Sequence, residues 1–129
     1  MEILKALKLI MVGDTGYQAA VTSTYIAALP MEAEHPSVTL HLVTGSDEFT
    51  HDGPTGLQQD LVRIYSRGTS DKECAAAARV VHALLQGYVG TVDGHQIQLI
   101  QHRNRNTDHD EQSDIYRQID DYRVHYRRV

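Results

Sequence analysis

The 129-residue sequence has one cysteine, few lysines and no long apolar run, and each shortage excludes a class of protein. The single cysteine, Cys74, excludes an internal disulfide and favours a reducing compartment. Residues 1–12 carry Glu2, Lys5 and Lys8 among their apolar positions, so they match neither a signal peptide nor a membrane span. We therefore expect synthesis in the cytoplasm and no contact with a membrane.

The sequence also lacks internal repeats, linkers rich in proline or serine, and low-complexity tracts. Its length falls within the range of a single domain, about 100 to 150 residues, which is enough to bury a core without disulfides or metals. We predict one domain that spans residues 1–129.

Positive charge is scarce as well. The sequence contains 12 Lys and Arg residues and 17 Asp and Glu residues, which gives a net charge of −5. General nucleic-acid binding needs an excess of cations, so this balance argues against it. The arginines, which outnumber the lysines, gather beyond residue 100 together with an equal number of acids. Because arginine forms forked contacts with carboxylates and is common at interfaces, this pattern indicates ion pairs between subunits. A solvated strand face explains it equally well.

No set of residues has the spacing of a catalytic or metal site. The histidines form no helical His-x-x-x-His pair, and adjacent side chains such as Asp108–Glu111 cannot all reach one ion. Cys74 lies on the apolar stripe of a predicted helix, and no serine is framed by glycines. We predict no catalytic residue, no metal, no cofactor and no enzymatic activity. A small metal-dependent hydrolase is the alternative from a different class, and a large effect of chelator on melting would favour it.

Periodicity predicts the secondary structure. The expected elements are a helix over residues 2–12 ended by Gly13, a turn at Gly13–Gly16, a strand or extended arm at Val21–Ala27, a strand at Ser37–Thr44, a long hairpin loop at Gly45–Gly56 with a turn at Asp52-Gly53-Pro54, a strand at Leu57–Ser66, a helix that starts with the capping box Ser70–Glu73 and ends at Gly87, a strand at His95–Arg103 after an Asp93-Gly94 turn, a mobile acidic loop at Asn104–Ser113, and a final strand from Ile115.

Four of these strands carry predictions about their faces. In the strand Ser37–Thr44 we expect Val38, Leu40 and Leu42 to point inward, and Thr39 and His41 to point outward. In the strand Leu57–Ser66, Val62 and Ile64 alternate with Leu61 and Tyr65, so we expect cover on both faces. In the strand His95–Arg103 we expect Ile97 and Leu99 to point inward. In the final strand, Tyr122, Val124 and Tyr126 alternate with Asp121, Arg123, His125 and Arg127. The predicted fold is α+β: a mostly antiparallel sheet packed on one face by one long and one short helix.

The final segment Tyr116-Arg117-Gln118-Ile119-Asp120-Asp121-Tyr122-Arg123-Val124-His125-Tyr126-Arg127 resembles the closing strand of tailed-phage tail completion proteins, also called tail terminator or tail-to-head joining proteins. Leu61–Ser66 is similar to the central strand of that family, and the alanine-rich helix that ends at Leu84-Leu85-Gln86-Gly87-Tyr88 is similar to its main helix. The short N-terminal helix and the connector between Pro30 and Pro36 extend the resemblance over most of the chain.

The resemblance implies a structural virion protein of the tail-neck region that forms a ring, with six subunits, at the head-proximal end of the tail tube. Such a ring ends tube polymerisation and contacts the tail-tube protein on one side and the head connector or completion protein on the other. DNA passes through its bore without specific binding, which the acidic net charge would favour. Other components of the same particles are alternatives: a head-closure protein, expected to be richer in β-barrel structure, or a tail-tube subunit.

A closed ring needs two different surfaces on each subunit. We expect these two surfaces to be formed by charged residues on strand faces and helix backs that do not take part in the core. The candidate interface residues are Asp60, Arg63, Arg67, Arg79, Arg117, Asp121, Arg123 and Arg127, with Asp60 and Asp121 as acidic partners of the arginines.

Overall fold

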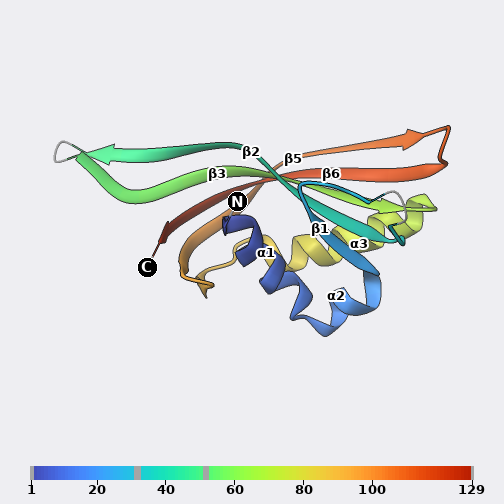
Figure 1. Ribbon diagram of the computed structural model, residues 1–129, viewed down its shortest axis with the longest axis horizontal. Helices are drawn as coiled ribbons and strands as arrows, with labels where there is room; N and C mark the ends of the chain where they lie inside the picture. The colour runs from blue at the N-terminus through green and yellow to red at the C-terminus, as the bar shows by residue number, and fades with distance from the viewer. Residues whose placement is uncertain (1, 31–32, 51–52, 129) are drawn as a thin grey trace.

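The computed structural model describes residues 2–30, 33–50 and 53–128, and side chains outside residues 45–56. Within these residues, three helices cover one face of a six-stranded sheet (Figure 1). The elements are α1 (Glu2–Val12), α2 (Thr15–Ala20), β1 (Ser23–Ile26), β2 (Ser37–Thr50), β3 (Gly53–Gly68), α3 (Asp71–Leu85), β4 (Gly90–Val92), β5 (His95–Asp110) and β6 (Ile115–Arg128).

The strands are arranged in the order β1-β2-β3-β6-β5-β4, and every neighbouring pair except β1 and β2 is antiparallel. The α+β prediction is therefore confirmed in its broad form. The sheet is mixed because β1 joins its edge in parallel. The prediction of one long and one short helix omitted α2, and β4 was not predicted either.

The two longer helices form where their sequence signals predict. Helix α1 buries Ile3, Leu4, Leu7 and Met11 and ends immediately before Gly13. At the start of α3, the hydroxyl of Ser70 accepts a hydrogen bond from the backbone amide of Glu73. The Glu73 carboxylate accepts the backbone amide of Thr69 rather than that of Ser70.

Residues predicted to form only a turn at Gly13–Gly16 instead begin α2. The Asp14 carboxylate accepts the backbone amide of Tyr17 at 2.9 Å and caps this short helix. Tyr17 is buried against the core, so one turn of helix is stabilised by packing that local sequence does not reveal. The extended segment predicted at Val21–Ala27 contains β1, as expected.

Both segments predicted to be long loops are largely strand, so those two predictions were wrong. Residues 44–50 of β2 pair with residues 53–61 of β3, and residues 104–110 of β5 pair with residues 115–121 of β6. Polar residues can form a ladder whenever a partner strand supplies the hydrogen bonds, without burying an apolar face. The predicted turn at Asp52-Gly53-Pro54 lies partly outside the described residues. The two hairpins extend from the body in opposite directions (Figure 1).

Strand register assigns the side chains to two faces of the sheet. Val62 and Ile64 are buried beneath the helices, as predicted, and so are Val38 and Leu40 of β2. Leu42 pairs with Val62 on the same side of the sheet but is 41% exposed, so it does not belong to the core as expected. Leu61 and Tyr65 are half-buried on the opposite face, where no described helix or strand covers them, so the prediction of cover on both faces was wrong. A bulge between Ile97 and Leu99 brings Ile100 inward, and the prediction of an inward Leu99 was therefore also wrong.

Candidate functional site

The face of the sheet opposite the helices, here called the helix-free face, is polar and rich in arginine. Positions that are paired across antiparallel strands point to the same side, so the register defines its members. The β6 alternation predicted from sequence is confirmed, since Tyr122, Val124 and Tyr126 are buried beneath the helices. The helix-free face includes Thr39 and His41 of β2; Leu61, Arg63, Tyr65 and Arg67 of β3; Arg117, Ile119, Asp121, Arg123, His125 and Arg127 of β6; and Gln101, Asn104, Asn106 and Asp108 of β5.

Near the middle of this face, Arg63 and Asp121 form a forked ion pair across β3 and β6. The Arg63 Nε lies 2.9 Å from one carboxylate oxygen of Asp121, and a terminal nitrogen lies 3.2 Å from the other. The hydrogen bond to Asp121 is the main cause of the raised pKa of Arg63. Asp121 is almost entirely buried, whereas Arg63 is more than one-third exposed. The pair therefore exposes its cation, not its carboxylate, to solvent.

Toward the end of the same strands, two arginines lie directly opposite each other. Arg67 pairs in register with Arg117, and both guanidinium groups lie over the ring of Tyr65, at 4.9 and 5.5 Å from its centroid. Arg117 forms a forked ion pair with Asp108, which raises the pKa of Arg117 and lowers that of Asp108. Arg67 donates instead to the buried hydroxyl of Thr39 at 2.7 Å. Burial lowers the pKa of Arg67, and the neighbouring Arg117 lowers it further.

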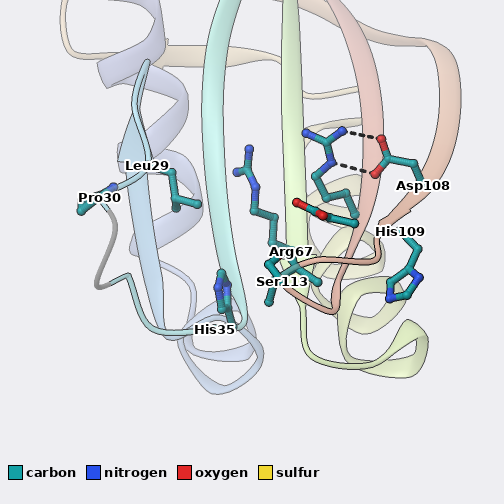
Figure 2. Close-up of a pocket in the computed structure, with 10 residues that line it drawn as sticks. Leu29, Pro30, His35, Arg67, Asp108, His109 and Ser113 are labelled. Atoms are coloured by element: carbon teal, nitrogen blue, oxygen red, sulfur yellow. Dashed lines mark hydrogen bonds and ion pairs between the residues drawn. The ribbon is translucent and has the colours of Figure 1, made fainter.

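A pocket of about 530 Å³ lies beside these two arginines (Figure 2). The segment between β1 and β2 forms one wall, and the turn between β5 and β6 forms the other. Arg67 lies between these walls, and the Asp108 carboxylate on the far side is bonded to Arg117. The lining residues are Leu29, Pro30, His35, Arg67, Asp108, His109, Asp110, Ser113, Ile115 and Arg117.

The remaining candidate interface residues lie in different places. Arg123 is on the helix-free face, where a terminal nitrogen donates to Gln59 at 3.3 Å and the buried Nε has no hydrogen-bond partner in the described part of the chain. Arg127 is exposed near the end of β6. Asp60 is on the helix side, buried, and accepts the Tyr126 hydroxyl at 2.6 Å. Arg79 is exposed on α3. The structure thus brings together Arg63, Arg67, Arg117, Asp121 and Arg123, and separates Asp60 and Arg79 from them.

A buried polar network on the helix side was not predicted as a site. Asp120, which is 2% exposed, accepts hydrogen bonds from His102 Nε2 at 2.8 Å, Arg105 Nε at 3.0 Å and Gln118 Nε2 at 3.0 Å. The ring of His102 packs against those of His82 and Tyr122. Asp120 and Asp121 lie on opposite faces of the strand, as the alternation of successive side chains requires. The same alternation puts Asp120 beside Tyr122 and Val124, so the sequence does contain a signal for its burial.

Two candidate nucleophiles near this network, Tyr122 and Cys74, have raised pKa values. Burial raises the pKa of the Tyr122 hydroxyl, which lies 3.3 Å from His82 Nδ1. Burial also raises the pKa of the Cys74 thiol to about 11, so the thiol is protonated at neutral pH, as expected of a packed cysteine. The hydrogen bonds from His102 and Arg105 to Asp120 connect β5 to β6.

Two features are absent from the described residues. Nowhere among the side chains of residues 2–30, 33–44 and 57–128 do three or more histidine, cysteine or acidic groups converge in a way that could hold a metal ion. None of the helices described in these residues is both long enough and apolar enough to cross a bilayer.

Comparison with known proteins gave one kind of similarity. No protein-family model matches the sequence, and no curated protein is significantly similar to it. Among solved structures, the fold is similar to that of a chain in the virion of a native gene transfer agent (GTA) particle. The two chains share 17% sequence identity with a TM-score of 0.70, and the match covers 95% of this chain and 92% of the other. At this identity, the comparison establishes the similarity of the fold.

Proposed function

We propose that this protein is a structural component of a tailed-phage-like virion, and that it forms a ring at the head-proximal end of the tail tube. The ring would end tube polymerisation and join the tail to the head connector. The observation that carries the proposal is the fold similarity to a chain of the GTA virion, which extends over nearly the whole length of both chains. The resemblance of β6 and α3 to tail completion proteins supports the same role independently.

The shape of the subunit suits a ring. A closed ring joins one surface of each subunit to a different surface of its neighbour. This chain offers two different ends, because the β2–β3 hairpin and the β5–β6 hairpin extend in opposite directions (Figure 1). The arginines of the helix-free face add a polar contact surface between them. We expect this surface to contact neighbouring subunits, the tail-tube protein or the head connector, and we expect no enzymatic activity.

Charge is compatible with the passage of DNA. The net charge is −5, and two arginines of the helix-free face, Arg63 and Arg117, are already paired with carboxylates. A surface of paired charges attracts phosphate far less than free cations do. DNA could therefore pass through the bore of a ring of these subunits without being retained.

Electron microscopy of particles made with this gene interrupted by a stop codon would test the proposal. We expect overlong tail tubes, or finished tails lying free beside filled heads. The control is the same stop codon with the intact gene supplied from a plasmid, which should restore joined particles. Tails of normal length on heads would contradict the proposal. Heads that lose their DNA while tails remain normal would favour a head-closure protein instead.

A further inference from the structure

The outer edge of β2 is only partly covered. Strand β1 pairs with residues 37–40 of β2, and the Ala27 amide donates to the Leu40 carbonyl at 2.8 Å. From residue 41 to residue 50, β2 runs beside β3 on its inner side, and no strand in the described part of the chain pairs with its outer side. The outer backbone groups of this stretch are therefore available to another strand.

Strand β5 has a similar open edge on the other side of the sheet. Strand β4 and the segment that follows α3 cover residues 95–102. From residue 103 to residue 110, no strand among the described residues pairs with the outer side of β5. The Thr107 amide donates there to the side chain of its own neighbour, Asn106, at 2.9 Å. A further strand can therefore pair with this edge too.

Exposed apolar side chains mark the start of the open edge of β2. Leu42 is 41% exposed and Val43 is 43% exposed, and they are two of the four large apolar side chains that are exposed among the described residues. An edge strand with exposed apolar side chains promotes pairing with another chain. A strand added to β2 at this point would cover apolar surface and satisfy the backbone at the same time.

The strand directions allow one copy of the chain to extend the sheet of the next. The steps from β2 to β3, from β3 to β6 and from β6 to β5 are all antiparallel, so β5 runs antiparallel to β2. When two copies lie side by side in the same orientation, β5 of one copy can therefore form an antiparallel ladder with β2 of the other.

The positions of the open edges also fit such a contact. They lie on the two hairpins, which extend in opposite directions from the body (Figure 1). Two copies that pair through these edges are therefore displaced along the strands relative to each other. This displacement keeps β1 and β4, which cover the remaining parts of the same edges, out of the contact.

We propose that the outer edge of β2, residues 41–50, pairs with the outer edge of β5, residues 103–110, of a second copy of this chain. This inference rests on the proposed function, since it specifies how neighbouring subunits of the ring meet. A second copy is the occupant because the chain supplies both edges, in matching directions, on opposite sides of one sheet. The two edges differ, so the contact is heterologous, and its repetition by a rotation closes a ring. The inference includes association of the purified chain without any other virion component.

Proline substitutions test the contact, because proline lacks the amide that a paired strand needs. The Leu40 carbonyl faces outward, so the backbone of Leu42, two residues farther along the strand, faces the same side. Leu42→Pro thus removes an amide from the outer edge of β2 and leaves the ladder with β3 intact. Thr107→Pro does the same on β5. Each variant alone should associate more than about tenfold more weakly than the wild type, as measured by sedimentation velocity.

Leu42→Ala and Thr107→Ala are the matched controls, since they shorten the same side chains and keep the amides. Thr107→Ala should associate like the wild type, and Leu42→Ala should associate more tightly than Leu42→Pro. Circular dichroism would check that all four variants are folded. If a proline variant does not fold, hydrogen exchange of the wild type replaces it, because the amides of Leu42 and Thr107 should exchange more slowly as the protein concentration rises.

Mixing the two proline variants gives the decisive measurement. In an equimolar mixture, the intact β2 edge of the Thr107→Pro variant can pair with the intact β5 edge of the Leu42→Pro variant. The other two edges of this pair are both blocked, so the mixture should form dimers and nothing larger. A symmetric contact, of β2 with β2 or of β5 with β5, would instead let one proline variant form dimers by itself.

Any of five results would overturn the inference: a wild-type chain that stays monomeric at all concentrations, a folded proline variant that associates as tightly as the wild type, one proline variant that forms dimers by itself, a mixture of folded variants that forms no dimers or assembles beyond them, or edge amides whose exchange does not depend on concentration.

The stop-codon experiment keeps the two proposals separate. If interruption of the gene gives overlong tubes but particles that carry Leu42→Pro are normal, the ring function stands and the contact is wrong. If interruption gives normal tails but the mixture forms dimers, the contact stands and the function is wrong.

Discussion

The two faces of the central sheet use the same strands for different purposes. On the helix side, Ile64, Tyr122 and Val124 are buried, and the acids among them are held by hydrogen bonds. On the helix-free face, the neighbouring positions of the same strands carry Arg63, Asp121 and Arg123. Apolar burial supplies most of the stability of a small domain, whereas partly exposed ion pairs supply little. We therefore expect the helix side to determine whether the chain folds, and the helix-free face to determine what it contacts.

The largest expected difference between the faces comes from truncating one aliphatic side chain on each. Ile64→Ala removes a side chain that is 1% exposed and should lower the free energy of unfolding by about 2–5 kcal/mol. Leu61→Ala removes a half-buried side chain from the other face and should cost no more than about 2 kcal/mol. Urea unfolding of both variants measures the difference. Equal losses would mean that both faces are covered, as in an intersubunit interface that persists in the purified protein.

A smaller difference is expected between the two adjacent acids of β6. Asp120→Asn weakens three hydrogen bonds to a buried carboxylate and should cost about 2–3 kcal/mol. Asp121→Asn weakens the pair with a guanidinium that is partly exposed to water and should cost about 1 kcal/mol or less. The urea concentrations at the unfolding midpoints of the two variants test this order, provided that the free energy of unfolding depends on urea concentration with the same slope in both. A greater loss for Asp121→Asn would reverse our assignment of structural and surface roles.

Mild acid should lower stability through one histidine on each face. The pKa values of His82 and His41 lie below the usual 6.5, in both cases mainly because of burial, with positive neighbours adding to the effect. These neighbours are His102 and Arg105 around His82, where Asp120 opposes the shift, and Arg67 and Arg63 around His41.

Because the folded protein then binds fewer protons than the unfolded chain, stability is highest above pH 6.5 and decreases as the pH falls through the folded pKa values. Melting temperatures measured from pH 8 to pH 5 should decrease in the wild type. The decrease should be smaller in His82→Gln and in His41→Gln, and smallest in the double variant. An unchanged decrease in the double variant would assign the acid sensitivity to other groups.

The smallest effect is expected at the exposed end of the helix-free face. Arg117→Ala removes the forked pair with Asp108, and both side chains are more than one-third exposed, so the free energy of unfolding should change by about 1 kcal/mol or less. A double-mutant cycle with Asp108→Ala isolates the energy of the pair itself. A coupling energy above about 2 kcal/mol would show that this pair contributes to folding as the helix side does.

Local patterns in the sequence predicted several elements correctly for physical reasons. Helix α3 begins at a capping box and has an apolar stripe along one side. Both features depend on residues that are only a few positions apart in the sequence. The alternation in β6 separates Tyr122 from Asp121 and Arg123, because successive side chains of any strand point to opposite faces. For the same reason, the amino-acid sequence alone is enough to identify the charged face of β6.

The two hairpins show where local patterns fail. Residues 104–110 are polar and acidic, yet they form a ladder with residues 115–121 because the partner strand satisfies their backbone hydrogen bonds. Likewise, the inward position expected for Leu99 was wrong because a bulge shifts the alternation by one residue. Neither the partner strand nor the bulge has a marker in the local sequence.

The sequence by itself determined the α+β class, the longer helices, the two faces of β6 and the acidic charge balance, because each depends on residue type and short-range periodicity. Only the tertiary structure decided the strand order, the length of the hairpins, and the pairing of Arg63 with Asp121. It also decided that Asp60 is bonded inside the fold, and that Arg67 lines a pocket without forming an ion pair to an acid of the described chain. The Arg63–Asp121 and Asp60–Tyr126 contacts join residues that lie 58 and 66 positions apart, and only the folded chain brings them together.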